Sequence, residues 1–125
     1  ARKWTWWMKI MTEIAQENLA KINKAGGVLA VGTDQSNGPA VHRELELLDA
    51  AGVPRADIIR IATLNSAIFL GKEKETGSVE EGKLADLLLV SANPLADIDN
   101  LKKIDMVIKN GVVIRRDQLN LPVNR

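Results

Sequence analysis

The stretch Gly26-Gly27-Val28-Leu29-Ala30-Val31-Gly32-Thr33-Asp34 decides the fold class of this sequence. Its two leading glycines are a typical helix stop, and apolar residues recur at helical spacing over residues 8–25, which predicts a helix there. The four apolar residues from Val28 to Val31 show no alternation, which is typical of a strand buried on both faces in a parallel sheet. A helix, a glycine stop and a buried strand in this order indicate an α/β fold.

The chain downstream divides into a helical part and a part richer in strands. Residues 35–40 are turn formers and predict a loop. Three helices are then expected from apolar spacing and from Gly52, Pro54 and Gly71: residues 41–51, a helix that begins at Pro54, and residues 65–70. Residues 72–75 are a charged connection. Three strands are expected after it: a buried one over 87–90, and 104–109 and 112–115, which flank the hairpin signal Asn110-Gly111. We therefore predict two domains, residues 1–75 and 76–125.

Composition excludes several classes of protein. The 125 residues carry a net charge of +1, which argues against a nucleic-acid-binding tail or a polybasic membrane anchor. No apolar run approaches the ~20 residues of a bilayer-spanning helix. Cysteine is absent, so disulfides, thiolate metal ligands and cysteine nucleophiles are excluded. We expect a cytoplasmic protein. All three tryptophans lie within residues 4–7, either packed on the body of the protein or forming a docking patch.

The residues that could carry chemistry are few. Asp34 lies just past the carboxyl end of the expected buried strand, where active-site groups of parallel α/β folds gather, although it could equally satisfy turn amides. Gln35, Ser36 and Asn37 are polar groups able to touch a substrate, and turn formation explains them as well. His42, the single histidine, is expected to have a structural place on its helix. One aspartate and one histidine cannot build a zinc site, which needs three or four ligands.

The order of the motifs along the chain is more informative than any single residue. Over about residues 28–115 the sequence carries Val31-Gly32-Thr33-Asp34, His42-Arg43-Glu44-Leu45, Ala62-Thr63-Leu64-Asn65-Ser66-Ala67, Gly77-Ser78-Val79-Glu80-Glu81-Gly82-Lys83-Leu84-Ala85-Asp86, Asn93-Pro94-Leu95 and Val107-Ile108-Lys109-Asn110-Gly111. This series resembles the C-terminal part of the metal-dependent amidohydrolase superfamily, particularly the branch related to imidazolonepropionase and some dipeptidases. The segment from Gly77 to Asp86 is the most specific piece of the resemblance.

The resemblance implies a fold and a domain arrangement. The fold class would be α/β, namely the C-terminal fragment of a (β/α)8 TIM-type barrel together with strands of a small composite β-sandwich. Residues 1–75 would form the end of the barrel, with 8–25 as its seventh helix and 28–33 as its eighth strand. Residues 76–125 would supply the C-terminal strands of the sandwich.

The resemblance also implies a reaction. The whole protein would hydrolyse amide, peptide or cyclic amide C–N bonds with water activated by one or two divalent metals, with zinc expected. Asp34 matches the family aspartate that ligates a metal and relays a proton. The other metal ligands of the family have no counterpart here, so the isolated chain is expected to hold no metal and to be inactive.

The expected partners are a small-molecule or peptide-like amide substrate, the N-terminal remainder of the same enzyme and, as a possibility left open, a second copy of the protein. Nucleic acid and membrane are not expected as partners. The alternative to the hydrolase is a non-catalytic small α/β module with an interaction or structural role.

Overall fold

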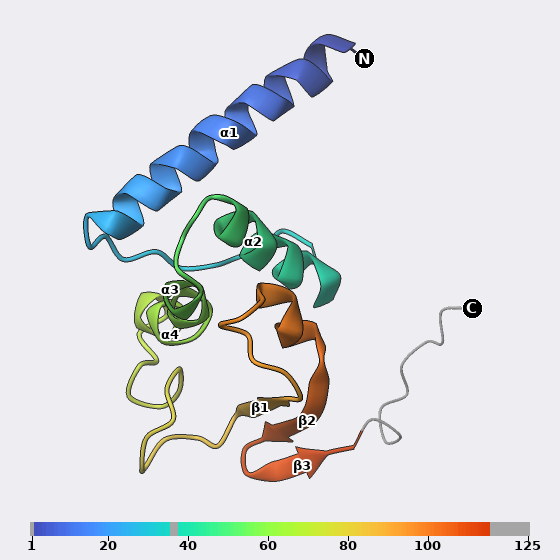
Figure 1. Ribbon diagram of the computed structural model, residues 1–125. Helices are drawn as coiled ribbons and strands as arrows, with labels where there is room; N and C mark the ends of the chain where they lie inside the picture. The colour runs from blue at the N-terminus through green and yellow to red at the C-terminus, as the bar shows by residue number, and fades with distance from the viewer. Residues whose placement is uncertain (1, 36–37, 116–125) are drawn as a thin grey trace.

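A long helix, a cluster of shorter helices and a small sheet make up the molecule (Figure 1). The computed structural model describes the backbone of residues 2–35 and 38–115, and the side chains of these residues from Met11 onward. The helical elements are α1 (Arg2–Lys24), α2 (Gly38–Ala50), α3 (Arg55–Arg60), the π-helical turn η1 (Ile61–Asn65), α4 (Ser66–Phe69) and the 3-10 helix η2 (Ile98–Lys102). The strands are β1 (Leu87–Val90), β2 (Ile104–Lys109) and β3 (Val112–Ile114). The structure is thus α/β in composition.

The first two helices confirm the sequence prediction with changed bounds. Helix α1 begins six residues before the predicted start, at Arg2, and includes the backbone of the tryptophan-rich segment; the packing of those indoles lies outside the described residues. Helix α2 begins at Gly38, inside the segment predicted as a loop. Pro39 explains the early start, because proline fits the first turn of a helix, where its missing N–H would have had no partner.

The prediction of a buried strand over residues 28–33 is wrong for this chain. The segment is extended but belongs to no sheet in the described residues, and Val28 is 68% exposed. A strand needs at least one neighbouring strand that pairs with its backbone, and the described residues place none beside this segment. Leu29 and Val31 instead pack against the helical core.

The helices share one core with a residue from the far end of the chain. Buried side chains from α2, from the turn after it and from α3–η1 meet Ile98 of η2; they are Leu45, Leu48, Val53, Ile58 and Ile61. The short helix η2 was not predicted from the sequence. Its signal is Asp97, whose carboxylate accepts a hydrogen bond from the Asp99 amide at 3.0 Å and so caps the first turn.

The strands form one antiparallel sheet in the order β1-β2-β3 within the described residues. Leu87 of β1 faces Ile108 of β2, and Val107 of β2 faces Ile114 of β3. The three strand positions agree with the prediction to within one residue. The predicted burial of β1 is wrong, since Leu88 and Leu89 are both exposed. No helix of the described residues is long and apolar enough to cross a membrane.

The Asn110-Gly111 hairpin is confirmed by its backbone. Both residues have positive φ, 52° and 79°, as a two-residue type I′ turn requires. We expect Gly111→Val to destabilise the fold by about 1–3 kcal/mol, because a β-branched residue is strained at this φ. The free energy of unfolding from urea titration measures the effect. Val112→Ala is the control, since Val112 is exposed on the adjacent strand, and an equal loss in both variants would contradict the turn assignment.

Candidate functional site

Asp34 lies where the extended segment turns toward α2. It is exposed and forms a bend with Gln35, whose amide donates to the Thr33 hydroxyl at 3.0 Å. Gln35 is exposed as well. The other two predicted substrate contacts, Ser36 and Asn37, lie outside the described residues. Asp34 thus follows an extended segment and not the buried strand that was expected before it, and its role in the reaction stays a prediction.

The described residues do not make a complete metal site around Asp34. Nowhere among them do three or more histidine, aspartate, glutamate or cysteine side chains converge on a point that could hold an ion. His42 is half-buried on α2, and its structural role stays a prediction. A zinc ion needs three or four protein ligands, so a metal at Asp34 would need donors from beyond the part of the chain described.

A hydroxyl joins the segment that carries Asp34 to the helices. The Val31 amide donates to the Ser66 Oγ at 3.3 Å, and the Ser66 Oγ donates to the Ile61 carbonyl at 2.8 Å. Ile61 is 1% exposed, so this contact lies against the core. Ser66 belongs to the family motif Ala62–Ala67, whose sequence alone predicts no role for its hydroxyl. Its hydroxyl lies next to the Ile61 carbonyl, five residues earlier in the chain, because residues 61–65 form a π-helical turn.

The segment Gly77–Asp86 packs the sheet region against the helices. Gly77 has a φ of +92°, and a Cβ on it would lie 2.6 Å from the Ala67 Cβ and 3.0 Å from the Leu64 Cα. Only glycine allows this approach of backbone to helix. Lys83 then folds back over the segment, with its side chain 11% exposed, and contacts the Ser78 hydroxyl and the Glu80 carboxylate.

Asp86 closes the same motif onto the hairpin. Its carboxylate pairs with Lys109 and accepts a hydrogen bond from the Asn110 amide at 2.7 Å, while the Ala85 carbonyl accepts one from the Gly111 amide at 3.0 Å. The hydrogen bond from Lys109, and after it the one from Asn110, lowers the pKa of Asp86 below its ordinary value. These contacts give the most specific piece of the sequence a structural explanation.

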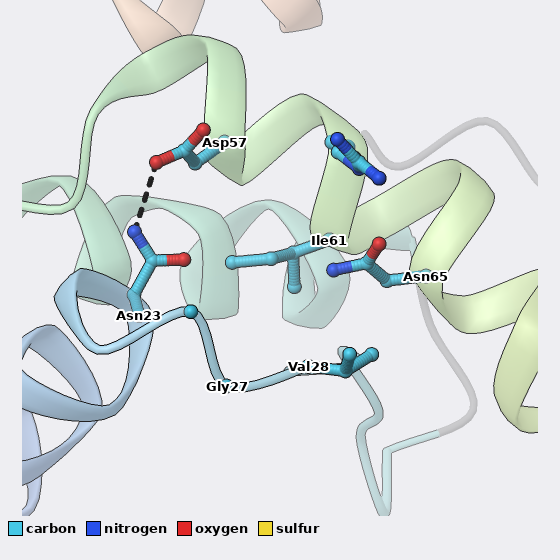
Figure 2. Close-up of a pocket in the computed structure, with 8 residues that line it drawn as sticks. Asn23, Gly27, Val28, Asp57, Ile61 and Asn65 are labelled. Atoms are coloured by element: carbon cyan, nitrogen blue, oxygen red, sulfur yellow. Dashed lines mark hydrogen bonds between the residues drawn. The ribbon is translucent and has the colours of Figure 1, made fainter.

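A pocket of about 210 Å³ opens at the other end of the extended segment. Figure 2 shows it between the end of α1, Gly27, Val28 and the α3–η1 helix. The Asn23 side chain donates to the Asp57 carboxylate at 2.9 Å across its rim, so the pocket also marks a polar link between α1 and α3. Asp34 does not line this pocket, and we therefore centre the candidate site on Asp34 and the Ser66 contact.

Comparison with known proteins identifies the family to which the chain belongs. The sequence profile of the Amidohydrolase family matches residues 12–114, and the chain belongs to this family.

Three relatives place the chain more closely within the family. It is 42% identical to a candidate prolidase from Bifidobacterium longum, with a TM-score of 0.71 over 78% of this chain and 25% of that one. It is 34% identical to a Xaa-Pro dipeptidase crystallised with methionine in its active site, with a TM-score of 0.72 over 80% and 25%. An imidazolonepropionase from Geobacillus sp. is 31% identical over 84% of this chain and 26% of the relative.

The chain thus spans about a quarter of the length of these relatives. The family and the relatives matched are hydrolytic enzymes. The resemblance drawn from the motifs is confirmed, and so is the part-length character of the match.

Proposed function

We propose that this chain is the C-terminal portion of a metal-dependent hydrolase that acts on amide, peptide or cyclic amide C–N bonds. The observation that carries the proposal is the family match over residues 12–114, together with Asp34 at the end of the apolar segment 28–33. Its relatives include a Xaa-Pro dipeptidase and an imidazolonepropionase, which supports a small amide or peptide-like substrate.

In the proposed whole protein, residues 28–33 become the eighth strand of a (β/α)8 barrel. Two observations support this: residues 28–33 are extended without a strand partner in the described part of the chain, and the apolar Val28 is 68% exposed. We place the barrel end at 1–75 and the sandwich strands at 76–125. Leu88 and Leu89 of β1 are both exposed, and since neighbouring residues of a strand point to opposite faces, one of the two is available to a second sheet. We also propose that the protein is cytoplasmic and that it assembles with a second copy of itself.

Asp34 is the residue of this chain that we assign to the reaction. We propose that it is one ligand of one or two divalent metals, zinc being expected, which supply Lewis acidity to the substrate carbonyl and to water. As general base, the Asp34 carboxylate accepts the proton that water loses when its oxygen attacks the carbonyl carbon. It then returns that proton to the leaving nitrogen as the C–N bond breaks. Gln35, Ser36 and Asn37 follow directly and are proposed to contact the substrate.

The proposal is tested by comparing the 125-residue chain with the protein completed by its N-terminal remainder. Both are dialysed with zinc, analysed for bound metal, and assayed with Xaa-Pro dipeptides and with a cyclic imidazolone. We expect metal and hydrolysis in the completed protein only, with activity lost to a chelator and restored by zinc. Full activity after complete metal removal, or no hydrolysis of any C–N substrate by the completed protein, would contradict the proposal.

A further inference from the structure

We propose that Asn110 is a site of spontaneous deamidation, and that the contacts of its hairpin turn protect it in the folded protein. Asparagine is one of the chemically labile residues of proteins. Asn110 is exposed, and the residue after it is Gly111, which has no side chain to shield its backbone nitrogen. The inference does not depend on the proposed hydrolase function, because neither Asp34 nor a metal takes part in this reaction.

The reaction joins the side chain of Asn110 to the backbone that follows it. The Gly111 nitrogen loses its proton and forms a bond to Cγ of Asn110, while the side-chain NH2 takes up a proton and leaves as ammonia. Water then adds to one of the two carbonyl carbons of the resulting imide ring and breaks the bond between that carbon and the nitrogen. Asn110 thereby becomes aspartate or isoaspartate, and water is the only co-reactant.

The backbone of the turn holds the two reacting atoms apart. The φ angles of 52° at Asn110 and 79° at Gly111 are typical of a type I′ turn. In such a turn ψ of the first central residue is about +30°, which turns the Gly111 nitrogen away from the Asn110 Cβ. Ring closure needs the nitrogen and Cβ on the same side of the Asn110 Cα–C bond, so the turn has to open before the new bond can form.

Two hydrogen bonds to the residues before β1 hold the turn closed. The Gly111 amide donates to the Ala85 carbonyl at 3.0 Å, and its proton is the one that must be lost before the nitrogen can attack. The Asn110 amide donates to the Asp86 carboxylate at 2.7 Å, and Lys109 pairs with the same carboxylate. All of these atoms belong to one hairpin and the segment paired beside it, so the protection does not depend on the N-terminal remainder.

Deamidation changes the turn so that it closes less well afterwards. Either product brings a second negative charge into the turn beside Asp86, and like charges repel. In isoaspartate the main chain also gains one carbon atom, which does not fit a two-residue turn between paired strands. A single opening of the turn can therefore have a lasting effect on the hairpin.

The test measures the modification of residue 110 in the completed protein and needs no assay of activity. Wild type, Asp86→Ala and wild type unfolded in guanidinium chloride are incubated in a mildly alkaline buffer, and peptide mapping by mass spectrometry gives the converted fraction. We expect slow conversion in the folded wild type and rapid conversion in the unfolded one. Conversion in Asp86→Ala should be about tenfold faster than in the folded wild type, since loss of a hydrogen bond to a charged group raises the population of the open turn by about this factor.

Two control variants separate the turn contacts from other effects. Ile58→Ala lowers the stability of the helical core, whereas the turn belongs to the sheet, so conversion of Asn110 should stay near the wild-type rate. Glu81→Ala removes an exposed carboxylate from the same motif as Asp86 and should also leave the rate unchanged. Equal acceleration in Ile58→Ala and Asp86→Ala would show that global unfolding controls the reaction, which overturns the protective role.

The unfolded sample contains its own reference. The sequence has a second asparagine–glycine pair, Asn37-Gly38, which peptide mapping resolves separately, and in guanidinium chloride both pairs should convert at similar rates. If Asn110 does not convert there while Asn37 does, Asn110 is not a modification site. If Asn110 converts as fast in the folded wild type as in guanidinium chloride, the turn gives no protection and the inference is wrong.

Discussion

Asp34→Asn in the completed hydrolase is expected to lower kcat by about a thousandfold or more. Asparagine has nearly the shape of aspartate, but it lacks the negative charge that would help to hold the metal and the basic oxygen that in our proposal accepts the proton of water. General-base catalysis alone contributes about 10²–10⁴-fold to a rate. Because Asp34 is exposed on a bend, the substitution should leave packing intact, and the melting temperature of the metal-free protein should stay near that of the wild type.

His42→Asn is the control for this experiment. His42 is half-buried on α2 and belongs to no metal-binding cluster in the described residues, so its replacement should change kcat far less than the replacement of Asp34. Steady-state kinetics at saturating zinc measure kcat for both variants. An Asp34→Asn protein that keeps more than about a tenth of the wild-type kcat would show that the general base lies elsewhere.

Ile58→Ala should have the largest effect on stability. Ile58 is 0% exposed and lies in the cluster that joins α2, α3 and η2. The substitution removes three buried carbon atoms and leaves a cavity in the core. Core substitutions of this type typically lower the free energy of unfolding by about 2–5 kcal/mol. The free energy of unfolding, from urea titration of the completed protein, measures the loss.

Ile68→Ala provides a comparison with the same side chain on the same helical run. Ile68 is 44% exposed, so its truncation removes fewer packing contacts and should cost clearly less than that of Ile58. Equal losses at the two positions would mean that the cluster around Ile58 is not the core that stabilises the chain.

The sequence predicted best those elements whose signals are local. The Asn110-Gly111 turn needs positive φ at two adjacent residues, and these two residue types accept it wherever they occur. Helices α1 and α2 were predicted from apolar spacing, with errors at their starts. Residues 28–33 failed as a strand because a strand exists only with partners, and a sequence pattern does not say whether those partners are present.

The candidate site was predictable in part and for the same reason. Asp34 is predicted as a site residue because it follows an apolar segment and matches a family motif, and this assignment stays a prediction. Ser66 was not given a role, since its use depends on the π-helical turn and on the approach of Val31, a residue 35 positions away. No periodicity in residues 61–66 marks that turn.

The position of Ile98 limits where the chain can be cut into separately expressed segments. It lies 23 residues after the proposed domain boundary at residue 75, yet its side chain completes the cluster formed by Leu45, Leu48 and Val53. A chain truncated after residue 75 would have a cavity in its helical core where the Ile98 side chain lies. A chain that begins at residue 76 would expose the Ile98 side chain to water. The two segments therefore have to be expressed together, and a fusion or split-reporter junction is better placed before α1 than between them.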